Sequence, residues 1–171
     1  MGGGLHGSLR GLPRLLIMSK EDVLELSLRL IRRFEGVSLV PYLCSAGVPT
    51  IGFGSTYYED GTKVTLKDPP ISRDLAEILL RNTVSKQYFP AVVARCPLLT
   101  DPNKIAALVS WTYNLGVNAL KTSTLRKKVQ EEKWEEAAKE ILKWDKARGK
   151  TIRGLTVRRQ AEAKLFLYNK E

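Results

Sequence analysis

Residues 34–56 read FEGVSLVPYLCSAGVPTIGFGST, and this stretch is the most informative about the fold. It starts at the end of an amphipathic helix and continues into a segment rich in Gly, Pro, Tyr and Thr. Two short runs of strand-like composition, around Tyr42 and around Ile51, lie on either side of Gly47, which is typical of a small β-hairpin. A helix end that runs into a hairpin can bring side chains from both to one cleft.

The pattern on both sides of this stretch is helical. The first helix begins at Ser19, where Asp22 completes a capping box, and we predict that Gly36 ends it. From Ser72 onward the periodicity predicts helices to the end of the chain. Their expected positions are from Ser72, from Asp101-Pro102 to about Leu115, within 124–143 with a break near Lys133, and from about Leu155 to Tyr168. We therefore expect an α+β fold, mainly α, with a small β-hairpin lobe and a larger helical lobe.

The chain has 171 residues, 43% of them hydrophobic, which is enough for one domain with its own core. Predicted core side chains include Leu75, Ile78, Leu79, Val84, Trp111, Trp134 and Trp144. We expect residues 18–171 to form this single domain. Residues 1–17 show no period, and Pro13 interrupts any helix, so we expect a disordered leader or a segment added upstream. No run approaches the ~18 apolar residues that a membrane-spanning helix needs.

Two residue types limit the chemistry. The only histidine, His6, lies in the leader, so a histidine-based triad or zinc site is not expected. No metal or organic cofactor is implied by any motif. Two cysteines allow at most one disulfide. We expect Cys96 to be a structural free thiol, the alternative being a Cys44–Cys96 disulfide that would block a cleft.

The positive charge is uneven. The formal net charge is +10, and residues 121–171 hold 15 Lys and Arg against 8 Asp and Glu. Two interpretations remain open, a solvated helical surface or an electrostatic footprint for a polyanion. No nucleic-acid-binding motif or basic platform with interleaved aromatic residues accompanies the charge, so we do not expect nucleic acid as the partner.

Glu35 is the most informative side chain. It closes a helix, so its carboxyl group faces the negative end of the helix dipole. This position favours the protonated carboxyl group over the carboxylate, which suits a general acid. Arg32 and Arg33 act in the opposite direction. Taken alone, Glu35 is more typical of an exposed residue near the C-terminus of a helix, and its neighbours in the sequence favour the role in catalysis.

Eight residues separate Glu35 from Cys44, and five separate Cys44 from Thr50. This Glu-x8-Asp/Cys-x5-Thr spacing resembles the phage-type lysozymes of glycoside hydrolase family 24. Further matches are Phe34-Glu35-Gly36, Pro41-Tyr42, Gly47, Thr50-Ile51-Gly52-Phe53-Gly54, the helix 107–116, Ser123-Thr124-Leu125, 134–138 and 154–162. The resemblance covers about residues 19–168, and the whole set in this order is specific.

The resemblance implies a lysozyme-like fold with a cleft between the two lobes. It further implies a muramidase, an enzyme that hydrolyses the β-1,4 bond between N-acetylmuramic acid and N-acetylglucosamine in peptidoglycan. Glu35 would protonate the leaving oxygen, and Cys44 and Thr50 would orient or activate water on the opposite face, with inversion at the anomeric carbon. Glycosidases usually use two carboxylates for these roles.

Cys44 stands where the commoner pattern of this family has Asp. A thiol with its ordinary pKa of about 8.5 is a weaker base at pH 7 than a carboxylate that is already ionised. Cys44 is therefore a partly ionised thiolate that polarises water, a weak acceptor beside a water held by Thr50, or a nucleophile that forms a covalent intermediate. We prefer the orientation of water.

The resemblance also implies a set of supporting residues. The substrate-binding positions are Gly52, Gly54, Thr56, Tyr113, Asn114 and Thr124. Arg158 belongs to the last matching block, Gly-Leu-x-x-Arg-Arg, at the start of the last predicted helix. It could reach Glu35 and hold it, or it could pair with other carboxylates at the surface. No metal ligand belongs to this set.

Two rival functions remain. A lytic transglycosylase cleaves the same glycan with one acid and leaves 1,6-anhydro products, and a non-enzymatic cationic protein would bind membranes or nucleic acid. By resemblance we expect a monomeric endolysin that stays in the host cytoplasm until a holin gives access to the periplasm and cell wall. Its partner is peptidoglycan, with contact to the anionic envelope through the basic residues.

Overall fold

A computed structural model describes residues 19–168 of the chain. The helices are α2 (Lys20–Phe34), α3 (Arg73–Thr83), the π-helical turn η2 (Val84–Tyr88), α4 (Phe89–Arg95), α5 (Pro102–Leu115), α6 (Val117–Thr122), α7 (Thr124–Gln130), α8 (Trp134–Leu142) and α9 (Arg153–Phe166). The strands are β1 (Ser38–Leu43), β2 (Pro49–Gly52), β3 (Lys146–Ala147) and β4 (Lys150–Thr151). The predictions for residues 1–17, His6 included, lie outside the described residues.

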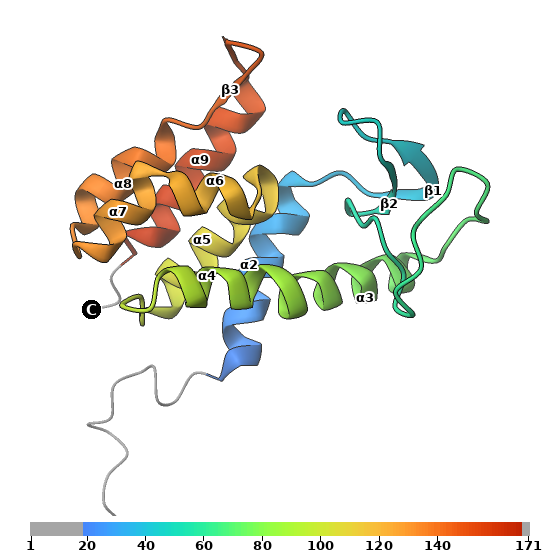
Figure 1. Cartoon of the computed structure of the whole chain (residues 1–171), viewed down its shortest axis with the longest axis horizontal. Coiled ribbons are helices and arrows are strands. Elements are labelled where there is room, and N and C mark those ends of the chain that lie inside the picture. Colours follow the sequence, from blue (N-terminus) through green and yellow to red (C-terminus); the bar gives the residue numbers. More distant parts are fainter. Residues whose placement is uncertain (1–18, 169–171) are drawn as a thin grey trace, which may run out of the picture.

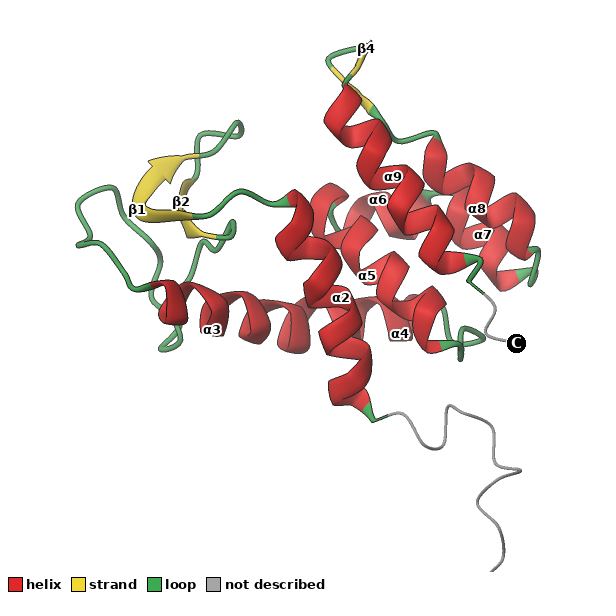
Figure 2. Cartoon of the chain, turned by 180° about the vertical axis from the view of Figure 1, so that it is seen from behind, coloured by secondary structure: helices red, strands yellow, loops and turns green. Residues whose placement is uncertain are grey.

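The described chain forms two lobes and is mainly α, as expected (Figure 1). The small lobe holds the antiparallel β1–β2 hairpin, in which Tyr42 pairs with Thr50. The large lobe holds the other helices around one apolar core. The rod formed by α3, η2 and α4 passes under the hairpin and continues into the large lobe, so it joins the two (Figures 1 and 2).

Local capping explains why the helices begin where the sequence predicts. The Ser19 side chain accepts from the backbone N–H of Asp22, and the Asp22 carboxylate accepts from the backbone N–H of Ser19. Ser72 accepts from Leu75 N–H in the same way, and Asp101 caps α5. The expected break between two helices in 124–143 is confirmed at residues 131–133.

The core of the large lobe is built around α5. Ile105 to Thr112 are all buried, and this helix contacts α2 on one side and α9 on the other. A smaller core of Ile51, Val64 and Leu79 fixes the small lobe on α3. Phe53 inserts from the small lobe into the larger core, so the two lobes share apolar contacts.

Three predictions about this fold are wrong. Residues 146–151 are not helical but form the β3–β4 hairpin, with Arg148 and Gly149 in the left-handed region at its turn. Ile78 is 45% exposed and lies on the outer face of α3. Trp144 is 37% exposed, although its ring meets buried Trp111 edge-on at 5.2 Å.

Candidate active site

A cleft of about 610 Å³ lies between the two lobes. Its walls come from the end of α2, the β1–β2 hairpin, the loop after it, the joining rod and the C-terminal end of α5. The lining side chains are those of Glu35, Tyr42, Cys44, Ser45, Thr50, Gly54, Thr56, Tyr57, Thr83, Gln87, Tyr88, Tyr113 and Asn114. The structure therefore brings Glu35, Cys44 and Thr50 to one cavity, together with four tyrosines from different parts of the chain.

Glu35 is the first residue beyond α2. Its backbone is extended (φ −87°, ψ 131°), while its N–H still donates to Ile31 O at 2.8 Å. The helix thus stops at Glu35, one residue before the predicted stop at Gly36, which does not adopt a positive φ. This change of direction at the helix end turns the carboxyl group into the cleft.

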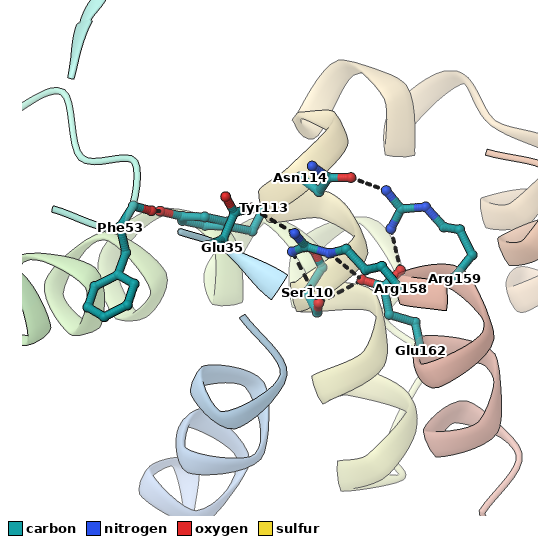
Figure 3. Close-up of polar contacts among 8 residues, drawn as sticks. All are labelled: Glu35, Phe53, Ser110, Tyr113, Asn114, Arg158, Arg159 and Glu162. Carbon is teal, nitrogen blue, oxygen red and sulfur yellow. Dashed lines mark hydrogen bonds and ion pairs between the residues drawn. The ribbon is translucent and has the colours of Figure 1, made fainter. Parts of the chain in front are cut away.

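Arg158 of α9 holds that carboxyl group from the protein side. Its Nη1 lies 2.7 Å from Oε1 of Glu35, and its Nη2 donates to the backbone oxygen of Ser110 at 3.1 Å (Figure 3). The side chain of Arg158 is 3% exposed, while that of Glu35 is 24% exposed. The ion pair therefore has its cation inside the protein and its carboxylate at the cleft surface.

A second buried carboxylate, Glu162, lies one turn further along α9. Ser110 Oγ donates to its Oε2 at 2.6 Å, Arg158 Nε lies 3.3 Å from the same oxygen, and Arg159 pairs with Oε1 (Figure 3). Both Arg159 and Glu162 are fully buried. Among the described residues, the carboxylate that pairs with Arg158 besides Glu35 is thus the internal one of Glu162.

Arg159 extends this network to the cleft wall. It donates to Oδ1 of Asn114 and, through Nε, to the backbone oxygen of Trp144 at 2.8 Å. Because the carbonyl oxygen of the Asn114 amide is occupied, the NH2 group remains for a ligand in the cleft. Sequence reasoning did not assign Arg159 and Glu162 to the site. The available signal was that Glu162 follows Arg159 by three residues and Arg158 by four on one helix.

Cys44 and Thr50 face the cleft from the small lobe. The Cys44 thiol is partly exposed and its pKa is lowered, chiefly by the backbone N–H groups of Val48 and Ala46 that favour a thiolate. The Thr50 hydroxyl donates to Val48 O at 2.8 Å. A hydroxyl has one proton, so in this orientation its oxygen can only accept from a ligand or water; turned the other way, it donates to the Cys44 sulfur.

Tyr113 spans the two lobes at the floor of the cleft. Its hydroxyl donates to the backbone oxygen of Phe53 at 2.5 Å (Figure 3). Its ring meets that of Tyr88 edge-on, with 5.1 Å between the ring centroids. Burial first, and the Glu35 carboxylate second, raise the pKa values of Tyr88 and Tyr113. Both phenols are therefore neutral, and the Tyr113 hydroxyl is already used to join the lobes.

The remaining predicted substrate positions divide into two groups. Gly54, Thr56 and Asn114 line the cleft. Gly52 and Thr124 do not: Gly52 lies with φ +69° against Ala76, and Thr124 is an exposed residue of α7. The lining residues that sequence reasoning missed are Tyr42, Ser45, Tyr57, Thr83, Gln87 and Tyr88.

Other chemical features of the described residues are few. Within residues 19–168 no three His, Cys, Asp or Glu side chains gather as a metal site would require. None of the described helices is long and apolar enough to cross a membrane. Cys44 and Cys96 are both free thiols, and burial raises the pKa of Cys96 to about 11.

Comparison with known proteins gives one consistent result. Residues 32–162 match the family described as phage lysozyme. The endolysin of Acyrthosiphon pisum secondary endosymbiont phage 1 is 36% identical over 146 residues, which is 83% of this chain and 95% of that protein. The endolysin of Salmonella phage P22 is 33% identical over 137 residues, 80% of this chain and 92% of that protein. The solved endolysin from Escherichia coli O157:H7 phage FAHEc1 superposes with a TM-score of 0.72 at 35% identity, covering 85% of this chain and 94% of that one.

Proposed function

The chain belongs to the phage lysozyme family, and from this membership we propose that its cleft hydrolyses the β-1,4 bond between N-acetylmuramic acid and N-acetylglucosamine. That it is a glycoside hydrolase that lyses peptidoglycan follows from the family and its endolysin relatives. One observation carries the finer proposal: Glu35, held by Arg158, shares the cleft with Cys44 and Thr50.

Glu35 is the general acid of this proposal. Its proton passes to the glycosidic oxygen as the bond from that oxygen to the anomeric carbon breaks. The carboxylate that remains lies beside the guanidinium of Arg158, so the negative charge left by the transfer has a partner 2.7 Å away. Arg158 is a positioning residue in this scheme, because it acts through Glu35.

Cys44 and Thr50 hold the attacking water in this proposal. Water attacks the anomeric carbon from the face opposite the leaving oxygen, which inverts the configuration, and the proton that it loses passes to the Cys44 thiolate or onward to solvent. The lowered pKa of Cys44 supports its role as acceptor, and the Thr50 oxygen supplies the second contact. Gly54, Thr56, Tyr113 and Asn114 would contact the glycan.

Product analysis tests this mechanism. Purified peptidoglycan is digested with the parent enzyme and with Glu35→Gln, Cys44→Ser and Cys44→Asp, and the fragments are examined by mass spectrometry and by NMR of the new anomeric centre. We expect reducing ends of inverted configuration, very little product from Glu35→Gln, and more product from Cys44→Asp than from Cys44→Ser. Fragments lighter by one water molecule would show that the enzyme is a transglycosylase and not a hydrolase. Full activity of Cys44→Ser would show that the mechanism does not need the thiol.

The cellular part of the proposal follows the endolysin relatives. Residues 18–171 act as one monomeric catalytic domain that waits in the host cytoplasm and reaches the wall through a holin. Expression with and without a pore-forming holin tests this route, with rapid lysis expected only when the pore is present. Lysis at the same rate without a pore would exclude holin dependence.

A further inference from the structure

The rod that joins the lobes contains a π-helical turn at the cleft. α3, η2 and α4 follow one another without a break, and Thr83 and Phe89 on either side of η2 both have helical backbone angles. Within η2 the N–H of Phe89 donates to the oxygen of Val84, five residues earlier instead of four. The turn therefore contains one residue more than an α-helical turn, and such insertions are rare and frequently lie at functional sites.

Buried residues on both sides of the turn show what the extra residue does. Ala76, Leu80, Val84, Val92 and Cys96 are buried in the same core, at a spacing of four or eight residues. An α-helix turns about 100° per residue, so side chains four residues apart differ in direction around the helix axis by about 40°. The extra residue in η2 rotates the following residues back by about 100°, so the buried side chains of both α3 and α4 face the same core.

The inserted residue also changes what the rod presents to the cleft. Thr83, Gln87 and Tyr88 all line it, one before the turn and two within it. Thr83 Oγ1 already donates to Leu79 O at 2.9 Å, and Tyr88 is fixed by its edge contact with Tyr113. Among the described residues Gln87 has no hydrogen-bond partner, and it is exposed. It is thus the side chain of this wall with a free donor and a free acceptor.

We propose that Gln87 binds the glycan directly, through a paired hydrogen bond to the acetamido group of one sugar, and that the π-helical turn exists to present it. A carboxamide offers one N–H donor and one C=O acceptor side by side, the complement of an acetamido group. The neighbouring Tyr88 stops the turn from shifting, because its ring is held against Tyr113. This inference rests on the proposed function in one respect: it takes the cleft to bind an N-acetylated glycan.

Binding measured without turnover tests Gln87. In a Glu35→Gln background, isothermal titration with the hexamer of N-acetylglucosamine compares Gln87→Ala, Gln87→Met and the control Gln160→Ala, an exposed glutamine of α9 outside the cleft. We expect Kd to rise about 3- to 10-fold for both Gln87 variants, as for loss of a neutral hydrogen-bond pair, and not to change for Gln160→Ala. In the active enzyme the same substitutions should raise KM and leave kcat nearly unchanged.

The Gln87→Met variant distinguishes a hydrogen bond from van der Waals contact with the glycan. Met fills nearly the same volume as Gln but has no amide, so affinity equal to that of the parent would overturn the proposed bond. Failure of the general-acid proposal would look different, since Glu35→Gln would then continue to cleave peptidoglycan whatever Gln87 does.

Deletion of Lys86 tests the turn itself. Lys86 is an exposed residue of η2 that does not line the cleft, and its removal reduces the separation between Val84 and Phe89 from five positions to four, as in an α-helix. We expect a folded protein by circular dichroism whose affinity for the hexamer falls at least as far as that of Gln87→Ala. Unchanged affinity would show that the turn does not position Gln87, and if the deletion variant does not fold, Gln87→Met decides the proposal.

Discussion

Nη1 of Arg158 lies 2.7 Å from Oε1 of Glu35, and the two residues are 123 positions apart in the chain. The arginine is buried and does not line the cleft. It can therefore orient Glu35 without occupying the space that a sugar would need. The contact also joins the last helix of the large lobe to the point where the small lobe begins.

Glu35→Gln should abolish lysis while the fold is retained. Loss of a general acid reduces rates by about 10²- to 10⁴-fold, and the amide oxygen of Gln can still accept from Arg158. Clearing of a purified peptidoglycan suspension measures the rate, and thermal melting measures stability. Retention of more than about a tenth of the parent rate would be incompatible with Glu35 as the acid.

Arg158→Met should lower both activity and stability. Removal of the cation leaves Glu35 without its partner and takes one of two arginines from buried Glu162. Breaking a buried ion pair from one side costs about 3 kcal/mol or more, which corresponds to a fall in Tm of about 6–12 °C for a chain of this size. Arg153→Met, an exposed position at the start of the same helix, is the control and should melt with the parent.

The two cysteines should differ sharply in reactivity at pH 7. The lowered pKa of Cys44 increases its thiolate fraction at that pH, while burial and a pKa of about 11 keep Cys96 protonated. Iodoacetamide should add one carbamidomethyl group, at Cys44, and activity should fall in step with modification. The activity of Cys44→Ser should be insensitive to the reagent, and labelling that begins at Cys96 would contradict the assignment.

Tyr113→Phe tests the tie between the lobes. The substitution keeps the ring against Tyr88 but removes the hydroxyl that donates to Phe53 O. Loss of this bond should cost about 1 kcal/mol, or about 2–4 °C in Tm. Tyr168→Phe, at an exposed tyrosine, should leave Tm unchanged. Equal Tm values for both variants would mean that the bond does not hold the lobes together.

Salt should affect wall binding more than cleavage of a short soluble glycan. The positive charge is concentrated in 121–171, and in the β3–β4 hairpin Lys146, Arg148 and Lys150 are exposed without an ion-pair partner among the described residues. Raising ionic strength from about 0.01 M to about 0.15 M shortens the Debye length from about 30 Å to about 8 Å. Cosedimentation of Glu35→Gln with cell walls should therefore fall steeply, while hydrolysis of a neutral oligosaccharide by the parent changes little. An equal fall in wall binding and in hydrolysis would show that the positive charge contributes to cleavage as well as to binding.

Sequence reasoning succeeded where the determining contacts are local. The caps at Ser19, Ser72 and Asp101 each use a side chain and a backbone N–H within three residues, so their positions could be predicted. The β3–β4 hairpin was missed because Lys, Ala and Arg around it favour helix, and the Arg148-Gly149 turn was the sole opposing signal.

The candidate site divides in the same way. Glu35, Cys44 and Thr50 lie within sixteen residues of one another, so a helix end and one hairpin suffice to bring them together. Gln87 reaches the cleft only because η2 contains an extra residue, and a regular period does not reveal that insertion. The buried pair of Arg159 and Glu162 depends on α9 packing against α5, a contact between segments about fifty residues apart.

Glu35 is carried by the large lobe, whereas Cys44 and Thr50 are carried by the small one. The distance between the general acid and the catalytic group on the opposite face of the sugar distinguishes two kinds of glycosidase. At a longer distance a water molecule fits between the second group and the sugar, and at a shorter one the second group attacks the sugar itself. In this molecule the distance between the two groups therefore depends on how the lobes are joined, by the rod of α3, η2 and α4 and by the hydrogen bond from Tyr113 to Phe53 O. For the proposed reaction, we therefore expect substitutions in the joining rod or at Tyr113 to alter the anomer produced, although these residues touch no reacting atom.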